Sequence, residues 1–220
     1  MYAGALLYGA SLFGFVLTPP GGAPPPQLSP TPQLVLDLEG LEGPESSDEA
    51  DLAEAIAERR QMADIHRAFG IATWASMAVT AVLGFLQLYD EYGLWEDAAN
   101  TPCARNDAIL GFCGDEVPWP HAIAAGTTAA LYTTTFILSF TMPDPLDQAS
   151  ANTPESERLR IHKTLRWFHL AGVVVLAALG GITANIDADY EVRRGLAWAH
   201  FGTAVATFGT LTAAGALMVF

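Results

Sequence analysis

The sequence predicts an all-α integral membrane protein, a four-helix bundle that follows an apolar N-terminal segment and a disordered acidic tether. The chain of 220 residues is 51% hydrophobic and only 15% charged, whereas soluble proteins carry about 25% charged residues. Its mean hydropathy is +0.27. Four apolar stretches are long enough to cross a bilayer, which takes about 17–25 residues in a helix. Because lipid offers no hydrogen-bond partners to the backbone, we expect each stretch to be helical.

The region before the bundle divides into two segments. Residues 1–23 contain an apolar, uncharged run at 3–17, which we interpret as a signal-like or anchoring segment. This run is short for a crossing and its start lacks the positive charge of a signal peptide, so a signal sequence, a signal anchor and a fifth crossing remain alternatives. Residues 24–60 form a proline-rich and then acidic linker, whose end at 48–60 is a candidate helical lead-in to the first crossing.

The bundle is expected over residues 61–220, and its helices are separated by recognisable breaks. The first apolar stretch ends at Asp90, and a long loop with both cysteines follows it. Pro118 suits the first turn of the second helix, and Pro143 ends that helix because proline cannot continue the hydrogen-bond ladder. The four apolar stretches are residues 66–89, 118–142, 162–186 and 195–220.

Each of these stretches carries a histidine at or near its start: His66, His121, His162 and His200. Consecutive spans alternate in direction, so the first and third start on one face and the second and fourth on the other. The histidines therefore sort into two pairs, His66 with His162 and His121 with His200. His169 lies two helical turns after His162 on nearly the same face, so it is an alternative partner for His66. Ionisable side chains inside a bilayer usually mark a functional site.

Two facing imidazoles can close both axial positions of a haem iron. Glycines near the histidines, including Gly70, Gly126 and Gly202, leave room for a porphyrin or for close helix contact. The sequence Ile-His-Arg at 65–67 is echoed by Ile-His-Lys at 161–163, which indicates a weak twofold repeat of helix pairs. Two stacked bis-histidine sites would make a transmembrane di-haem electron carrier.

This pattern of helices and histidines resembles the cytochrome b561-like superfamily, whose core has four helices with one haem-ligating histidine each, paired first with third and second with fourth. The resemblance covers about residues 61–220. It implies two b-type haems and a membrane oxidoreductase subunit, with axial ligands His66, His121, His162 (or His169) and His200. The long cysteine loop departs from the family core, and no ascorbate-site or quinone-site signature is found, so the donor and acceptor stay unassigned.

Basic residues and cysteines predict the orientation in the membrane. By the positive-inside rule the basic side is cytoplasmic, as in the inner membrane of a bacterium. Cys103 and Cys113 then lie outside, where a disulfide between them can persist. If residues 1–23 are a cleaved export signal the orientation inverts, whereas an uncleaved fifth crossing reconciles the two signals. Seven of the ten basic residues flank the first and third helices on one side: Arg59, Arg60, Arg67, Arg158, Arg160, Lys163 and Arg166.

Several function classes are excluded or kept as rivals. No nucleophile–base arrangement, phosphate loop or HExxH motif occurs, so no catalytic residue is assigned, and basic surface is too scarce for nucleic acid. The expected partners are the lipid bilayer, an electron donor and acceptor (a quinone or a soluble redox protein), and further copies or a larger complex. The rival functions are a cofactor-free structural or assembly subunit and a small transporter or proton relay that uses histidine and threonine.

Overall fold

The computed structural model describes residues 45–114 and 117–219, and this part of the chain is helical with no strands. Four of its helices are long and apolar enough to cross a membrane, which confirms the predicted all-α integral membrane bundle. The predicted segment 1–23 and the linker up to residue 44 lie outside the described residues. The elements are α1 (Glu45–Tyr92), η1 (Ala98–Asn100), α2 (Pro102–Arg105), α3 (Trp119–Thr141), α4 (Pro154–Asn185) and α5 (Tyr190–Val219).

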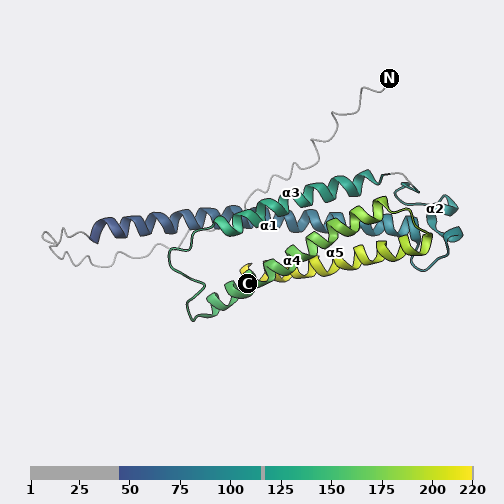
Figure 1. Ribbon diagram of the computed structural model, residues 1–220. Coiled ribbons are helices and arrows are strands. Elements are labelled where there is room, and N and C mark those ends of the chain that lie inside the picture. The colour runs from purple at the N-terminus through teal and green to yellow at the C-terminus, as the bar shows by residue number, and fades with distance from the viewer. Residues whose placement is uncertain (1–44, 115–116, 220) are drawn as a thin grey trace, which may run out of the picture. The chain divides into compact units, whose positions relative to one another are not determined.

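Helix α1 includes the candidate helical lead-in at residues 48–60 and starts three residues before it. It begins at Glu45 and continues without a break to Tyr92. Residues 48–60 are rich in alanine, leucine, glutamate and arginine, which are good helix formers. Extending an existing helix also avoids the cost of a new nucleus. The residues nearest the bundle therefore form a helical lead-in that is continuous with the first span, and this lead-in runs past the other helices in Figure 1.

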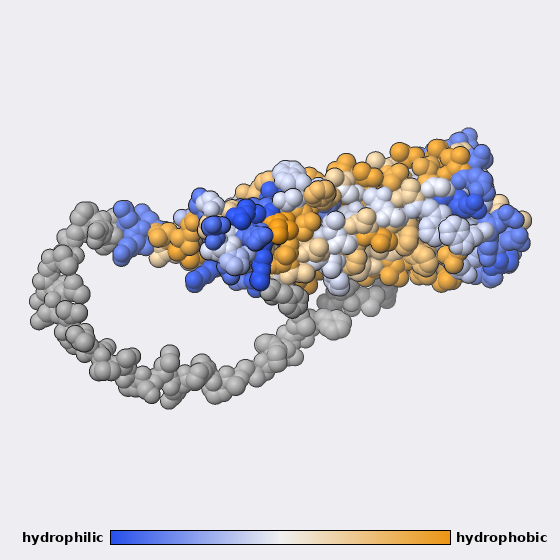
Figure 2. All heavy atoms as spheres, turned by 90° about the horizontal axis from the view of Figure 1, so that it is seen from below, coloured by the Kyte–Doolittle hydropathy of each residue, from blue (hydrophilic) through white to orange (hydrophobic). Residues whose placement is uncertain are grey.

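The four long helices form two antiparallel pairs (Figure 1). Helix α1 packs along α3, and α4 packs along α5. The backbones of the two pairs approach each other mainly where α1 contacts α5. Helices α1 and α4 make few backbone contacts, and the same holds for α3 and α5. Helices α3 and α4 meet through side chains such as Tyr132 and His169, which leaves α1 and α4 diagonally opposite in the bundle, and likewise α3 and α5. Figure 2 shows apolar residues along the length of the bundle and hydrophilic residues at its ends, as a bilayer requires.

Small and hydroxylated side chains hold each pair together. Between α1 and α3, the Thr73 and Thr135 hydroxyls are 3.0 Å apart. Between α4 and α5, a Cβ added to Gly172 would lie 2.1 Å from Oγ1 of Thr207, so only glycine permits this approach. In lipid the hydrophobic effect does not drive helices together, and such close contacts and interhelical hydrogen bonds take over that role.

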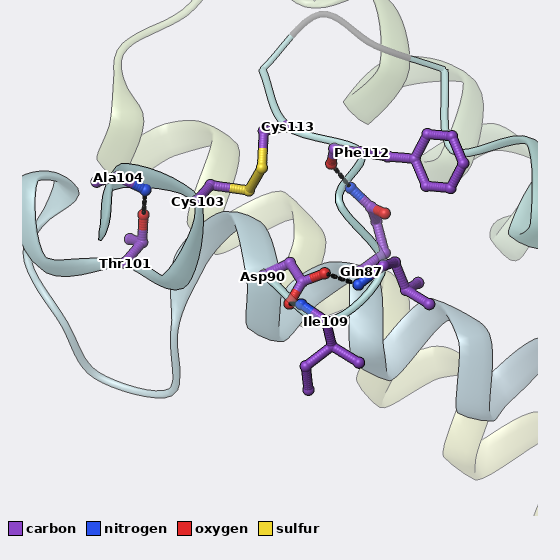
Figure 3. The surroundings of a disulfide bond; sticks show 9 residues. Gln87, Asp90, Thr101, Cys103, Ala104, Ile109, Phe112 and Cys113 are labelled. Carbon is purple, nitrogen blue, oxygen red and sulfur yellow. Dashed lines mark hydrogen bonds between the residues drawn. A yellow bond between two sulfur atoms is a disulfide. The ribbon is translucent and has the colours of Figure 1, made fainter. Parts of the chain in front are cut away.

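The connection between α1 and α3 is stapled to the end of α1 (Figure 3). Cys103 and Cys113, the two predicted partners, are joined in a disulfide. The fully buried Asp90 carboxylate accepts hydrogen bonds from the backbone N–H groups of Ile109 at 2.7 Å and Leu110 at 2.6 Å. These bonds and the disulfide give this loop a fixed conformation at one end of the bundle, called the disulfide end below.

The variant Asp90→Ala is expected to loosen the disulfide end. It leaves two backbone N–H groups without their acceptor, and each unsatisfied buried group costs about 1–3 kcal/mol. Thermal unfolding of the detergent-solubilised protein should shift to lower temperature, and limited proteolysis should cut the loop between α1 and α3 faster. Asp97→Ala, which alters an exposed acid in the same loop, is the control. An equal effect of both variants would contradict the role assigned to Asp90.

Candidate functional site

The structure brings four of the five predicted histidines together as two facing pairs. His66 on α1 and His162 on α4 have ring centroids 6.3 Å apart and ring planes at 82°. His121 on α3 and His200 on α5 have centroids 6.3 Å apart and planes at 81°. Each pair therefore joins diagonally opposite helices that hardly contact each other through their backbones. The two pairs have nearly the same geometry.

His169, the alternative partner of His66, has a different neighbour. Its Nδ1 lies 2.8 Å from the hydroxyl oxygen of Tyr132 on α3, and both side chains are buried. The two rings also meet edge to face, with centroids 5.6 Å apart. His162 is thus the histidine that faces His66, and His169 forms a separate polar contact in the interior. The sequence offered no signal for Tyr132, because a single tyrosine in an apolar helix is common.

Backbone carbonyls hold the rings of His121 and His162. Nδ1 of His121 lies 3.2 Å from the Thr80 carbonyl oxygen on α1, and Nδ1 of His162 lies 2.9 Å from the Ala214 carbonyl oxygen on α5. A ring whose Nδ1–H donates to a carbonyl has Nε2 free of a proton and able to bind a metal. Metal-binding histidines commonly have such a partner, which fixes both tautomer and ring orientation.

The other two histidines face the backbone in the corresponding way. The His66 ring lies near the backbone of Thr135 on α3, and the His200 ring lies near the backbone of Leu176 on α4, without a hydrogen bond at Nδ1 of either ring. In both rings Nδ1 is buried and falls outside the geometry of a hydrogen bond. Each of the four rings therefore lies near the backbone of the partner helix: α3 for His66, α1 for His121, α5 for His162 and α4 for His200.

A constant spacing relates these backbone groups to the histidines. On each of the four helices, the residue fourteen positions after the histidine has its backbone near the ring of a histidine on the neighbouring helix. Fourteen residues correspond to about 21 Å of helix. The two histidine pairs therefore lie at two levels of a bilayer whose hydrocarbon core is about 30 Å thick. The pair α1–α3 repeats as α4–α5, as the short histidine motifs predict. The spacing relates His66 to Thr80, His121 to Thr135, His162 to Leu176, and His200 to Ala214.

Two equivalent glycines make room for the rings at the disulfide end. Gly84 on α1 would, with a Cβ, lie 2.8 Å from Cε1 of His121, and Gly180 on α4 would lie 3.2 Å from Cε1 of His200. Each glycine comes eighteen residues after the histidine of its own helix. A larger side chain at either position would push the facing ring out of place.

The glycines nearest the histidines in sequence do not touch the rings. A Cβ on Gly126 or Gly202 would meet nothing within 4 Å, and one on Gly70 would reach only a methyl group of Thr135 at 4.0 Å. The space beside Gly126 and Gly202 is therefore open. Helices pack with their partners, so the clearance for a ring is provided by the neighbouring helix.

The donor set at each level consists of two imidazoles. Within residues 45–114 and 117–219, no three or more histidine, cysteine, aspartate or glutamate side chains gather in a group that could hold a metal ion. Two imidazoles suit an iron whose remaining positions are filled by a porphyrin. Compared with protein-family models, curated proteins and solved structures, the chain gives no match.

Proposed function

We propose that this protein carries electrons across a membrane through two b-type haems, one between His66 and His162 and the other between His121 and His200. The spacing of the rings carries the proposal. With a metal–imidazole bond of about 2.0–2.1 Å and five-membered rings with bonds of about 1.33 Å, two imidazoles that shared one iron would have centroids about 6.3–6.5 Å apart. Both pairs have centroids 6.3 Å apart.

An ordinary edge-to-face contact between two aromatic rings also places their centroids about 4.5–7 Å apart. Three features favour ligation of a shared iron over such a contact. The same spacing and angle occur twice. The paired rings project from helices that are not packed together, which is what an interposed macrocycle requires. The hydrogen bonds of His121 and His162 use Nδ1, so Nε2 remains for iron.

The residues of this chain would hold, orient and shield the cofactors, and the haem itself would supply one-electron chemistry. Gly84 and Gly180 leave the His121 and His200 rings free to adopt the ligating orientation. The two levels lie close to opposite faces of the bilayer, so an electron would enter at one face and leave at the other. The donor and acceptor are each a quinone or a soluble redox protein.

The proposed orientation puts the basic side in the cytoplasm and the disulfide end in an oxidising compartment. Seven of the ten basic residues lie in residues 59–67 of α1 and 158–166 of α4, and Arg59 and Lys163 from these two segments both pair with Asp144. The disulfide between Cys103 and Cys113 belongs to the opposite end. A bacterial inner membrane separates two such compartments.

The deciding experiment is the haem stoichiometry of the purified, detergent-solubilised protein. We expect a Soret band that shifts on reduction and two haem b groups per chain by the pyridine haemochrome assay. One haem would restrict the proposal to a single histidine pair. A protein that is folded by circular dichroism but binds no haem, even after haem is added, would overturn it and leave the structural subunit and the proton relay.

A further inference from the structure

The disulfide end exposes a large aromatic side chain that the histidine pairs do not account for. Trp95 follows α1 and is 85% exposed. Its ring stacks on that of Trp198 on α5, with centroids 5.6 Å apart and planes at 9°. Tryptophan is enriched among the residues that contribute most to protein–protein binding. Such a side chain, presented on one face and supported from behind, is suited to a partner protein.

The backbone around Trp95 is fixed in place. The Tyr190 hydroxyl donates to the carbonyl oxygens of Tyr92 and Glu96, both at 3.1 Å. The Arg194 guanidinium donates to the same Glu96 carbonyl at 3.0 Å. These bonds tie the residues on both sides of Trp95 to α5. A surface that is already ordered loses little conformational entropy when a partner binds.

The surroundings of Trp95 are strongly acidic. The described residues 90–114, 117–118 and 186–194 contain eight acidic and three basic residues, and one of the eight acids, Asp90, is fully buried. Two of the three arginines are already paired: Arg105 with Glu96 and Asp107 at 3.6 and 3.3 Å, and Arg194 with Glu191. Acidic side chains that remain exposed include Asp97, Asp187 and Asp189.

This distribution of charge selects the kind of partner. In the part of the chain that the structure describes, the acidic side chains do not form a cluster that could hold a metal ion. Anionic lipid headgroups would be repelled by this end. A protein with a positively charged face would be attracted and oriented by it, and the attraction would weaken with salt.

Aromatic contacts connect the Trp95 surface to one histidine pair. The Trp198 ring lies 6.0 Å from the ring of Phe201, which lies 5.3 Å from Phe85 on α1. Trp198 and Phe201 flank His200 in the sequence of α5. The surface is therefore one side chain away from the helical turn that carries the His200 ligand.

We infer that a soluble one-electron carrier protein with a positively charged face docks on Trp95 and the acidic residues around it. With a haem held by His121 and His200, one electron would pass between that haem and the metal centre of the docked carrier, so that one centre is oxidised as the other is reduced and no bond is made or broken. This inference rests on the proposed function for its electron-transfer step, but docking itself is measurable without it.

The test measures binding of the full chain, held in nanodiscs of zwitterionic lipid, to a soluble c-type cytochrome of net positive charge. We expect saturable binding that weakens as the ionic strength rises past physiological values, where charges are screened beyond about 8 Å. An acidic [2Fe–2S] ferredoxin is the opposite-charge probe and should not bind. Equal binding of both probes, or binding that is independent of salt, would overturn the inference.

Two sets of variants locate the surface. Asp97→Asn with Asp187→Asn should weaken binding about tenfold, mainly by slowing association. The same change of charge in Asp48→Asn with Asp51→Asn, on the exposed start of α1 at the other end, should have no effect. Trp95→Ala should also weaken binding about tenfold by speeding dissociation, and Trp95→Phe should restore part of it. Binding that is unchanged in the Asp97→Asn, Asp187→Asn variant or in Trp95→Ala would overturn the inference.

Haem content, measured on every variant by absorption, separates the two proposals. A protein with two haems that fails to bind the cationic cytochrome would overturn the docking surface and leave electron transfer intact. A protein without haem that binds the cytochrome at Trp95 would overturn electron transfer and leave the docking surface. Self-association of the chain through Trp95, seen by sedimentation in detergent, would replace the carrier with a second copy and overturn the inference.

Discussion

On the proposed function, replacing His200 by alanine should remove the haem at the disulfide end and leave the other haem in place. His200 supplies one of only two imidazoles at its level, and iron with one axial ligand and no enclosing partner ring should be lost on purification. The pair of His66 and His162 uses other residues and lies about four helical turns away. The haem-to-protein ratio should fall from two to one, and a redox titration should lose one of its two steps.

Two further variants make this prediction specific. His162→Ala should remove the other haem, whereas His169→Ala should keep both, because His169 contacts Tyr132 and not His66. Circular dichroism checks that each variant is still folded. Loss of both haems in His200→Ala with helicity retained would mean that the two sites are not independent. Loss of a haem in His169→Ala, with His162→Ala unaffected, would reassign the ligand.

Replacing Gly180 by valine is expected to displace the His200 ring and weaken binding of the same haem. Even a Cβ at this position would lie 3.2 Å from Cε1 of His200, and the branched side chain adds two more carbons. Overpacking of this kind costs about 1–3 kcal/mol, or roughly 5- to 150-fold in an equilibrium constant. Haem transfer to apomyoglobin from the variant should be faster, and only at the disulfide-end site.

The adjacent glycine provides a matched control. A Cβ on Gly181 meets nothing within 4 Å, so Gly181→Val makes the same chemical change in the same turn without touching the ring. It should retain both haems with unchanged transfer rates. On α1, Gly84→Val should act as Gly180→Val does, through the His121 ring. Equal effects of the Gly180 and Gly181 variants would show that valine disturbs α4 itself, and not the ligand.

Most of the fold can be predicted from the sequence because the bilayer permits so few alternatives. Length and hydropathy define four spans, and prolines mark some of their limits. Helix α3 stops at Thr141, just before Pro143, and α4 begins at Pro154. Alternating helix direction indicates which helices share a histidine level, the first with the third and the second with the fourth. The start of α1 does not follow, because a strongly acidic segment of good helix formers is compatible with both a solvated tether and a helix.

The details of the site depend on neighbouring helices, and a single sequence does not reveal these. Whether His162 or His169 faces His66 is decided by Tyr132, which binds His169 from α3. The carbonyls of Thr80 and Ala214 belong to the backbone, so their side chains give no clue to the role. The spacing of two glycines is a signal for the ring clearance: Gly84 and Gly180 each follow the histidine of their own helix, His66 and His162, by eighteen residues.

Because the paired histidines come from diagonally opposite helices, neither helical hairpin contains both histidines of a pair. The α1–α3 hairpin contributes His66 and His121, and the α4–α5 hairpin contributes His162 and His200. On the proposed function, every iron bridges the two halves of the molecule, so cofactor affinity and hairpin association are thermodynamically linked. A cell starved of haem would hold two inserted but loosely joined halves, and cofactor supply would govern how much of this protein escapes quality-control proteolysis.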